Sequence, residues 1–112
     1  MDETLRAELL EMEATQRRHY ERMHTIMKTY GWPGRSLTRE DGCKAAWFIV
    51  QNAVLDPKLQ CDAFECLLKA TAQGEAERWM ASLLIDHVVR HKKRAEREHR
   101  LSRDQEEKPS SL

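Results

Sequence analysis

Apolar residues recur every three or four positions through most of the chain, which is the spacing of one face of an α-helix. The clearest stripe lies within residues 2–29, where the spacings alternate between four and three residues, as in a heptad repeat. We expect one long helix there, with a polar break at its middle that either fixes register or faces a ligand cleft. The stripe consists of Leu5, Leu9, Met12, Gln16, His19, Met23, Ile26 and Tyr30.

Turn and capping residues divide the rest of the chain into three further helices. The segment Gly31-Trp32-Pro33-Gly34 ends the first helix, because a proline disfavours helical backbone at the residue before it. Thr38, with Asp41 three positions later, is typical of a helix start and predicts a helix over residues 39–53.

Asp56-Pro57 combines a capping residue with a proline in the first turn, which predicts a helix over residues 57–72 that Gly74 ends. The last helix is expected from about Glu75 to about residue 100. It should bury Ala76, Met80, Leu83, Leu84 and Val88.

These elements predict an all-α, four-helix domain. Residues 1–30 would form a long packing arm, residues 31–95 a helical core, and residues 96–112 a charged tail without fixed structure. A core of about 60 residues buries too little surface to be stable alone, so the first helix or a second copy must cover it. We therefore expect an intertwined homodimer.

Composition narrows the class of protein. The chain has 112 residues, of which 6% are aromatic and seven are glycine or proline, which argues against a β-sandwich or barrel. The longest apolar run, residues 45–50, is far too short to span a membrane, and the acidic N-terminus does not resemble a signal peptide. Three cysteines without metal-site spacing indicate reduced thiols and a cytoplasmic location.

Charge is balanced overall, at 19 basic and 19 acidic residues, but basic residues concentrate after residue 89. The run Arg90-His91-Lys92-Lys93-Arg94 continues to Arg97, Arg100 and Arg103. It is either a solvated helix end, a contact for an anionic partner, or a nucleic-acid contact. Nucleic acid is the least favoured, since no aromatic residues interrupt the run and two glutamates dilute it.

A few polar residues are candidates for chemistry. His87 and His91 lie one helical turn apart and could share a metal with His19 or Asp86, but the surrounding basic run would repel a cation. We therefore expect neither a metal nor another cofactor. Gln51 and Asn52 either satisfy the Gly-Trp-Pro-Gly loop or hold peptide groups of a ligand.

Asp86 either pairs with Arg35 or Arg78, or acts as a base or ligand contact. Trp32 lies on a loop, where it either lines a cleft or fills the core, and Trp47 is expected in the core.

In order and spacing, several of these motifs resemble those of an uncharacterised bacterial helical domain family. The similarity covers about residues 29–89. It rests on Gly31-Trp32-Pro33-Gly34-Arg35-Ser36-Leu37, Asp41-Gly42, Ala45-Ala46-Trp47, Gln51, Ala53, Asp56-Pro57, Gln60 and Gly74-Glu75. The chain departs from the family where a histidine is replaced by Asn52, where an Asp-Arg pair reads Asp86-His87, and where a C-terminal Tyr-Gly-Thr-Gln is absent.

Within that family, the chain resembles the small proteins that form the lysinoalanine bridge of cinnamycin- and duramycin-type lantibiotics. This resemblance implies a cofactor-free addition of a peptide lysine amine to a dehydroalanine, promoted mainly by holding the modified precursor peptide in position. Under this hypothesis Asp86 and His87 assist or orient the base. Substrate is bound by His19, Trp32, Arg35, Trp47, Gln51 and Asn52.

The alternative hypothesis is a non-catalytic dimeric adaptor that binds a peptide or protein through its first helix and its basic end. A cleft that gathers Gln51, Asn52 and Asp86 would favour the enzyme, and their use in local structure would favour the adaptor.

Overall fold

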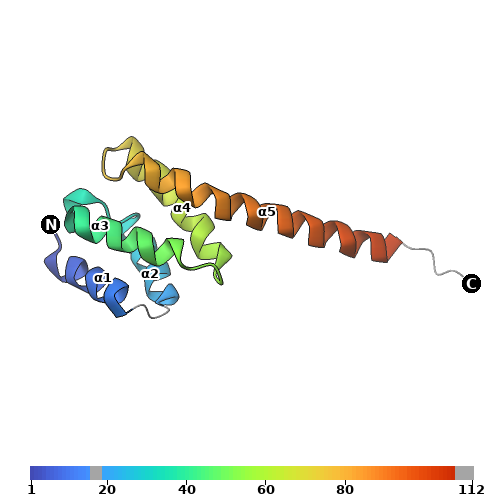
Figure 1. Ribbon diagram of the computed structural model, residues 1–112, viewed down its shortest axis with the longest axis horizontal. Helices are drawn as coiled ribbons and strands as arrows, with labels where there is room; N and C mark the ends of the chain where they lie inside the picture. The colour runs from blue at the N-terminus through green and yellow to red at the C-terminus, as the bar shows by residue number, and fades with distance from the viewer. Residues whose placement is uncertain (16–18, 108–112) are drawn as a thin grey trace, which may run out of the picture.

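The computed structural model describes residues 1–15 and 19–107, except for the side chains of 104–107. This part of the chain forms five helices and no strand, so the predicted all-α class is confirmed, while the structure has five helices where four were expected. In Figure 1, α1 to α3 gather at one end, and α4 and α5 form a hairpin beside them. The helices are α1 Glu3–Thr15, α2 Tyr20–Tyr30, α3 Arg35–Gln51, α4 Pro57–Ala72 and α5 Arg78–Glu107.

The N-terminal segment is two helices, not the single long helix that the heptad stripe predicted. His19 has non-helical dihedral angles (φ −101°, ψ 41°) and precedes α2, while Gln16 lies outside the described residues. The Arg22 Nη2 group of α2 lies 3.0 Å from the Glu8 carboxylate of α1. In one straight helix these residues would lie about 21 Å apart, so α2 must fold back along α1.

Folding back lets both halves of the stripe enter one core. Leu5, Leu9 and Met12 of α1 are buried, as are Met23, Ile26 and Met27 of α2. These side chains join a single cluster with Trp47, Leu59, Leu67 and Leu84 from the other helices. The N-terminal segment therefore covers the core of its own chain, which removes the reason for expecting a homodimer. The dimer itself stays a prediction.

The start of α3 contains a kink. Arg39 has φ 62° and ψ 179°, inside a helix that otherwise runs from Arg35 to Gln51. Thr38 is fully buried, and its hydroxyl donates to the carbonyl oxygens of Pro33 (3.1 Å) and Gly34 (3.2 Å). The Asp41 carboxylate instead binds Arg6 of α1 and the Gly42 amide. The predicted capping box between Thr38 and Asp41 is therefore wrong.

The prediction for α4 is confirmed at both ends. The Asp56 carboxylate accepts the Leu59 amide at 3.0 Å, Pro57 is the first helical residue, and Gly74 follows the end of the helix with φ 75°. The same carboxylate lies 3.0 Å from His24 Nε2 of α2, which links the start of α4 to the N-terminal segment.

Helix α5 begins at Arg78, three residues later than predicted, and runs to Glu107. Ala76, Met80, Leu84 and Val88 are buried as expected, whereas Leu83 is 51% exposed, so its predicted burial is wrong. Of the predicted tail without structure, residues 96–107 are helical, and residues 108–112 lie outside the described residues. The second half of α5 extends past the other helices (Figure 1), and the molecule measures 67 × 29 × 21 Å.

Candidate functional site

The Gly-Trp-Pro-Gly segment forms a buried corner between α2 and α3. The Trp32 side chain is only 6% exposed, and its indole N–H donates to Cys43 Sγ at 3.3 Å. Pro33 is also fully buried. Burial raises the pKa of the Cys43 thiol and so favours its protonated form. Trp32 fills the core here and does not line a cleft.

Glu75, in the turn before α5, fixes this corner to the other end of the domain. Its carboxylate accepts hydrogen bonds from both the amide and the hydroxyl of Ser36, each at 2.8 Å, and these bonds lower the pKa of Glu75. The Glu75 carbonyl oxygen accepts the Arg35 amide at 3.0 Å. A Cβ on Gly34 would lie 2.7 Å from Glu75 Cβ, so only glycine fits this approach.

Trp47 and Gln60 complete the scaffold. The Trp47 indole N–H donates to the Met80 carbonyl oxygen at 2.9 Å, and its ring packs edge-on against Trp79 with centroids 4.8 Å apart. Gln60 is 3% exposed, and its side-chain amide donates to the Val50 carbonyl oxygen at 3.1 Å. Trp32, Gly34, Trp47, Gln60 and Glu75 thus hold the helices together.

The remaining predicted site residues are spread over the molecule. Arg35 is exposed, 3.7 Å from Glu77, and does not pair with Asp86. His19 lies 3.3 Å from Thr15 Oγ1 and lines a hollow of about 270 Å³ with Glu8 and Arg22.

Asn52 caps the end of α3 and lines a different hollow, of about 450 Å³, with Leu10 and Phe48. The Gln51 Oε1 atom is buried and has no hydrogen-bond partner among the described residues. Neither carboxamide satisfies the Gly-Trp-Pro-Gly corner, whose polar groups bind Thr38, Cys43 and Glu75 instead.

Asp86 is exposed on α5 and has no hydrogen bond or ion pair within the described part of the chain. His87 lines a third hollow, of about 210 Å³, together with His91, Arg90 and Arg94. None of these three hollows gathers Gln51, Asn52 and Asp86, the cluster on which the enzyme hypothesis depends. Sequence reasoning did not anticipate that the loop after α3 and the start of α4 would face this histidine pair.

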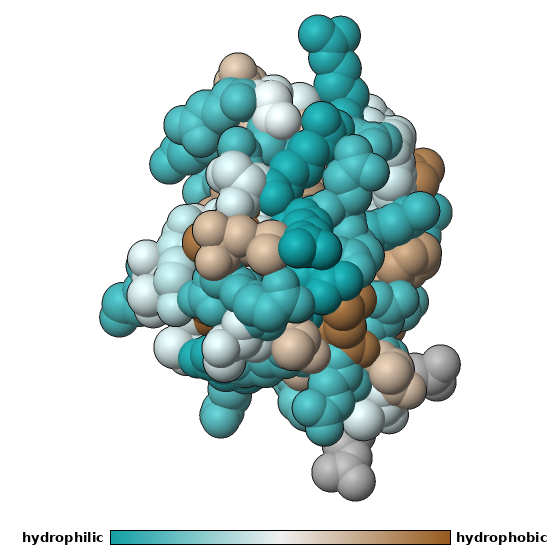
Figure 2. Space-filling view, turned by 90° about the vertical axis from the view of Figure 1, so that its left-hand side faces the viewer, coloured by the Kyte–Doolittle hydropathy of each residue, from teal (hydrophilic) through white to brown (hydrophobic). Residues whose placement is uncertain are grey.

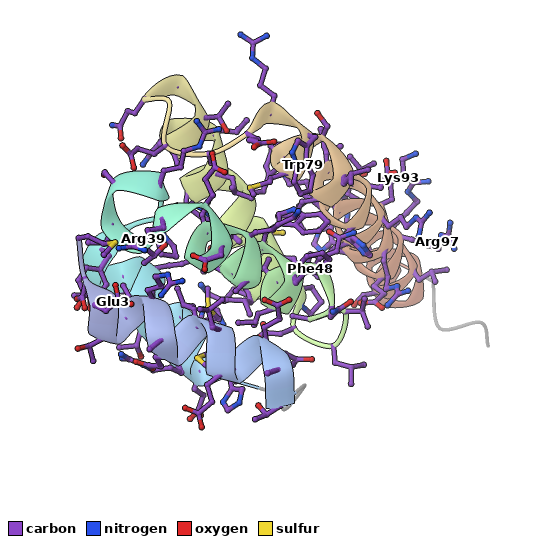
Figure 3. All side chains as sticks on the ribbon, turned by 60° about the vertical axis from the view of Figure 1, so that its left-hand side comes forward. Glu3, Arg39, Phe48, Trp79, Lys93 and Arg97 are labelled. Carbon is purple, nitrogen blue, oxygen red and sulfur yellow. The ribbon has the colours of Figure 1, made fainter. Side chains whose placement is uncertain are left out.

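The basic stretch of α5 is the largest concentration of charge in the structure. Residues 90–103 carry seven Lys and Arg against two Glu, whereas residues 1–89 carry 11 against 14 Asp and Glu. All side chains from 92 to 103 are exposed. Lys93 and Arg97 point from α5 away from the other helices (Figure 3). The exposed cationic side chains from Lys92 to Arg100 are therefore accessible to a partner.

Figure 2 views the molecule from the end opposite the projecting half of α5. Hydrophilic residues cover most of it, and apolar residues show as separate patches (Figure 2). Scattered apolar residues of this kind are normal on a protein surface and do not indicate a partner.

No known protein family, curated protein or solved structure matches the chain. Within residues 1–15 and 19–107, no helix has the length and apolar character needed to cross a membrane. The same residues contain no group of three or more histidine, cysteine or acidic side chains placed to hold a metal ion.

Proposed function

We propose that the protein is a non-catalytic helical adaptor that binds an acidic helical segment of another protein along the basic face of α5. The observation that carries this proposal is the exposed, positively charged half of α5, which extends beyond the core. An unpacked helix of this length gains its stability from a partner, since isolated helices of 12–15 residues are marginal in water.

One stripe of α5 has the spacing of a helix–helix contact. Its residues are separated alternately by four and three positions, the heptad pattern by which two helices pack. Leucines stand at both ends, 51% and 56% exposed, and cationic or imidazole side chains lie between them. We name this stripe the α5 seam: Leu83, His87, Arg90, Arg94, Arg97 and Leu101.

The positive charge of the α5 seam favours an acidic partner. A second copy of α5 would bring arginines against arginines, and like charges across a helical contact are destabilising. A helix with glutamates between its apolar residues would match both the charge and the leucines. Nucleic acid fits less well, because the domain beside α5 carries an excess of acidic residues that would repel phosphates.

The lysinoalanine hypothesis stays a prediction that the positions of its residues do not support. It is tested with a dehydrated, hydroxylated cinnamycin-type precursor, incubated with the protein and then with a small thiol. Bridge formation consumes the dehydroalanine, so a peptide that resists the thiol only after meeting the protein would establish the cyclase and displace the adaptor proposal.

The adaptor proposal is tested by fluorescence anisotropy with a labelled synthetic peptide whose heptads alternate leucine and glutamate. Arg97→Glu should weaken binding roughly fivefold or more, because it reverses a charge within the α5 seam. Lys92→Glu is the matched control, since it makes the same change roughly 140° around the helix and should alter binding less than about twofold. Equal losses in the two variants, or tighter binding of duplex DNA than of the peptide, would refute the proposal.

A further inference from the structure

The third hollow lies where α5 passes the start of α4. It encloses about 210 Å³ and combines four side chains of α5 with the loop after α3 and the first turn of α4. The four residues of α5 are His87, Arg90, His91 and Arg94, and their spacing of three, one and three positions places them on one face of the helix. The full lining is Val54, Pro57, Gln60, His87, Arg90, His91 and Arg94.

This lining is cationic without a counter-charge. Two guanidinium groups and two imidazoles line the hollow, and no carboxylate does. Neither Arg90 nor Arg94 has an ion pair within the described residues. Two carboxylates adjoin the lining along the chain. Asp56 binds the Leu59 amide and His24, and Asp86 makes no ion pair within the described residues. An anion in the hollow would relieve the mutual repulsion of the two arginines.

The size of the hollow restricts the anion. Sites for drug-sized ligands and cofactors usually enclose about 300–1,000 Å³, more than this hollow offers. A single tetrahedral group fits better. Guanidinium forks bind phosphate oxygens in pairs, and a phosphate monoester carries up to two negative charges and three terminal oxygens, more than a carboxylate offers to four donors.

We propose that this hollow binds a phosphate monoester, carried by a phosphorylated serine or threonine of the acidic partner. This inference rests on the proposed function, because the hollow adjoins the α5 seam and shares His87, Arg90 and Arg94 with it. The partner's phosphate would sit at the base of α5 while its acidic helix continues along the exposed half. Phosphorylation of the partner would then control its binding.

Two probes test the hollow, both with the full-length protein. The first is inorganic phosphate, followed by NMR of the His87 and His91 ring resonances, with chloride at equal ionic strength as the control. The second is the acidic heptad peptide with one phosphoserine near the end that meets the hollow, compared with the same peptide carrying serine. We expect saturable shifts with phosphate and about tenfold tighter binding of the phosphopeptide.

Variants separate this inference from the adaptor proposal. His91→Gln and Arg94→Gln should reduce the gain from phosphorylation, and circular dichroism would confirm that both variants keep their helices. Of these two residues, only His91 lies outside the α5 seam. Arg97 lies outside the hollow, so Arg97→Glu should weaken the binding of both peptides by the same factor and leave the phosphate titration unchanged.

Three outcomes would overturn the inference. If phosphate and chloride act alike, the hollow does not select phosphate. If the two peptides bind equally while inorganic phosphate shifts the histidines, the hollow takes a small free phosphate and not a phosphorylated partner. If phosphorylation strengthens binding equally in wild type and His91→Gln, the phosphate binds elsewhere. These outcomes are separate from the test of the adaptor proposal, which is whether Arg97→Glu weakens the binding of the unphosphorylated peptide.

Discussion

Arg39 occupies a backbone conformation that side chains rarely adopt, and its replacement by glycine should stabilise the protein. With φ 62° and ψ 179°, it lies in a region populated almost only by glycine. The kink that it forms lets the turn at Thr38 close on Pro33 and Gly34 before the rest of α3 begins. The buried hydrogen bonds of Thr38, on the N-terminal side of the kink, thus hold Arg39 in this conformation.

The size of the effect follows from two opposing contributions. Holding a residue with a Cβ in this region costs roughly 1–3 kcal/mol. Glycine loses more backbone entropy on folding, which reduces the gain in stability by about 0.5–1 kcal/mol. The Arg39 side chain contributes little, because its contact with Met1 Sδ (2.9 Å) is exposed. The free energy of unfolding should therefore rise by about 0.5–2 kcal/mol in Arg39→Gly.

Urea unfolding followed by circular dichroism measures this free energy, and Arg39→Ala is the matched control. Alanine also removes the Met1 contact but keeps the Cβ and its strain, so Arg39→Ala should lie close to wild type. Within an ordinary helix, glycine is less stable than alanine by roughly 0.5–1 kcal/mol. At residue 39 we expect the reverse, with the glycine variant more stable than the alanine variant. A glycine variant less stable than the alanine variant would show that residue 39 is helical and that α3 has no kink.

Two further changes act on the corner at Glu75. Gly34→Ala should lower the free energy of unfolding by about 1–2 kcal/mol in urea, because its Cβ would meet Glu75 Cβ at 2.7 Å. If Gly34→Ala lowers the free energy of unfolding by the same amount in a Glu75→Gly background, this contact is not the cause. Glu75→Gln should destabilise the protein at neutral pH. The difference in free energy of unfolding between the variant and wild type should become smaller as the pH falls below 4.5, the ordinary pKa of glutamate. The depressed pKa of Glu75 gives the folded state a benefit that is present above that value and lost as the carboxylate protonates, so a gap independent of pH would refute the assignment.

The sequence predicted the helical class and both ends of α4, where the signal is local, but α3 begins four residues earlier and α5 three residues later than predicted. Asp56-Pro57 and Gly74 act within a few residues of themselves, and the structure confirms both ends of α4. The stripe in residues 2–29 was misread because a heptad pattern continues equally through one long helix or two helices that fold back on one core. Only the contact between Glu8 and Arg22, far apart in sequence, distinguishes these arrangements.

The candidate site was harder to predict, because the same residue types serve scaffold and chemistry. Trp32 and Trp47 were predicted to bind substrate, yet each donates its indole N–H to a partner within the domain. Such partners come from segments distant in the chain and leave no periodic signal. The basic run and a last helix to about residue 100 were predicted from the sequence. The continuation of α5 to Glu107, where a tail without fixed structure was expected, was not.

The projecting half of α5 also changes how the molecule moves through solution. A compact protein of 112 residues has a radius of gyration of about 13 Å, against 17.5 Å for this one. Elongation raises the hydrodynamic radius, so the single chain would leave a sizing column earlier than a compact protein of the same mass and would look heavier than it is. Light scattering, which weighs particles independently of their shape, is therefore the measurement that can count its subunits.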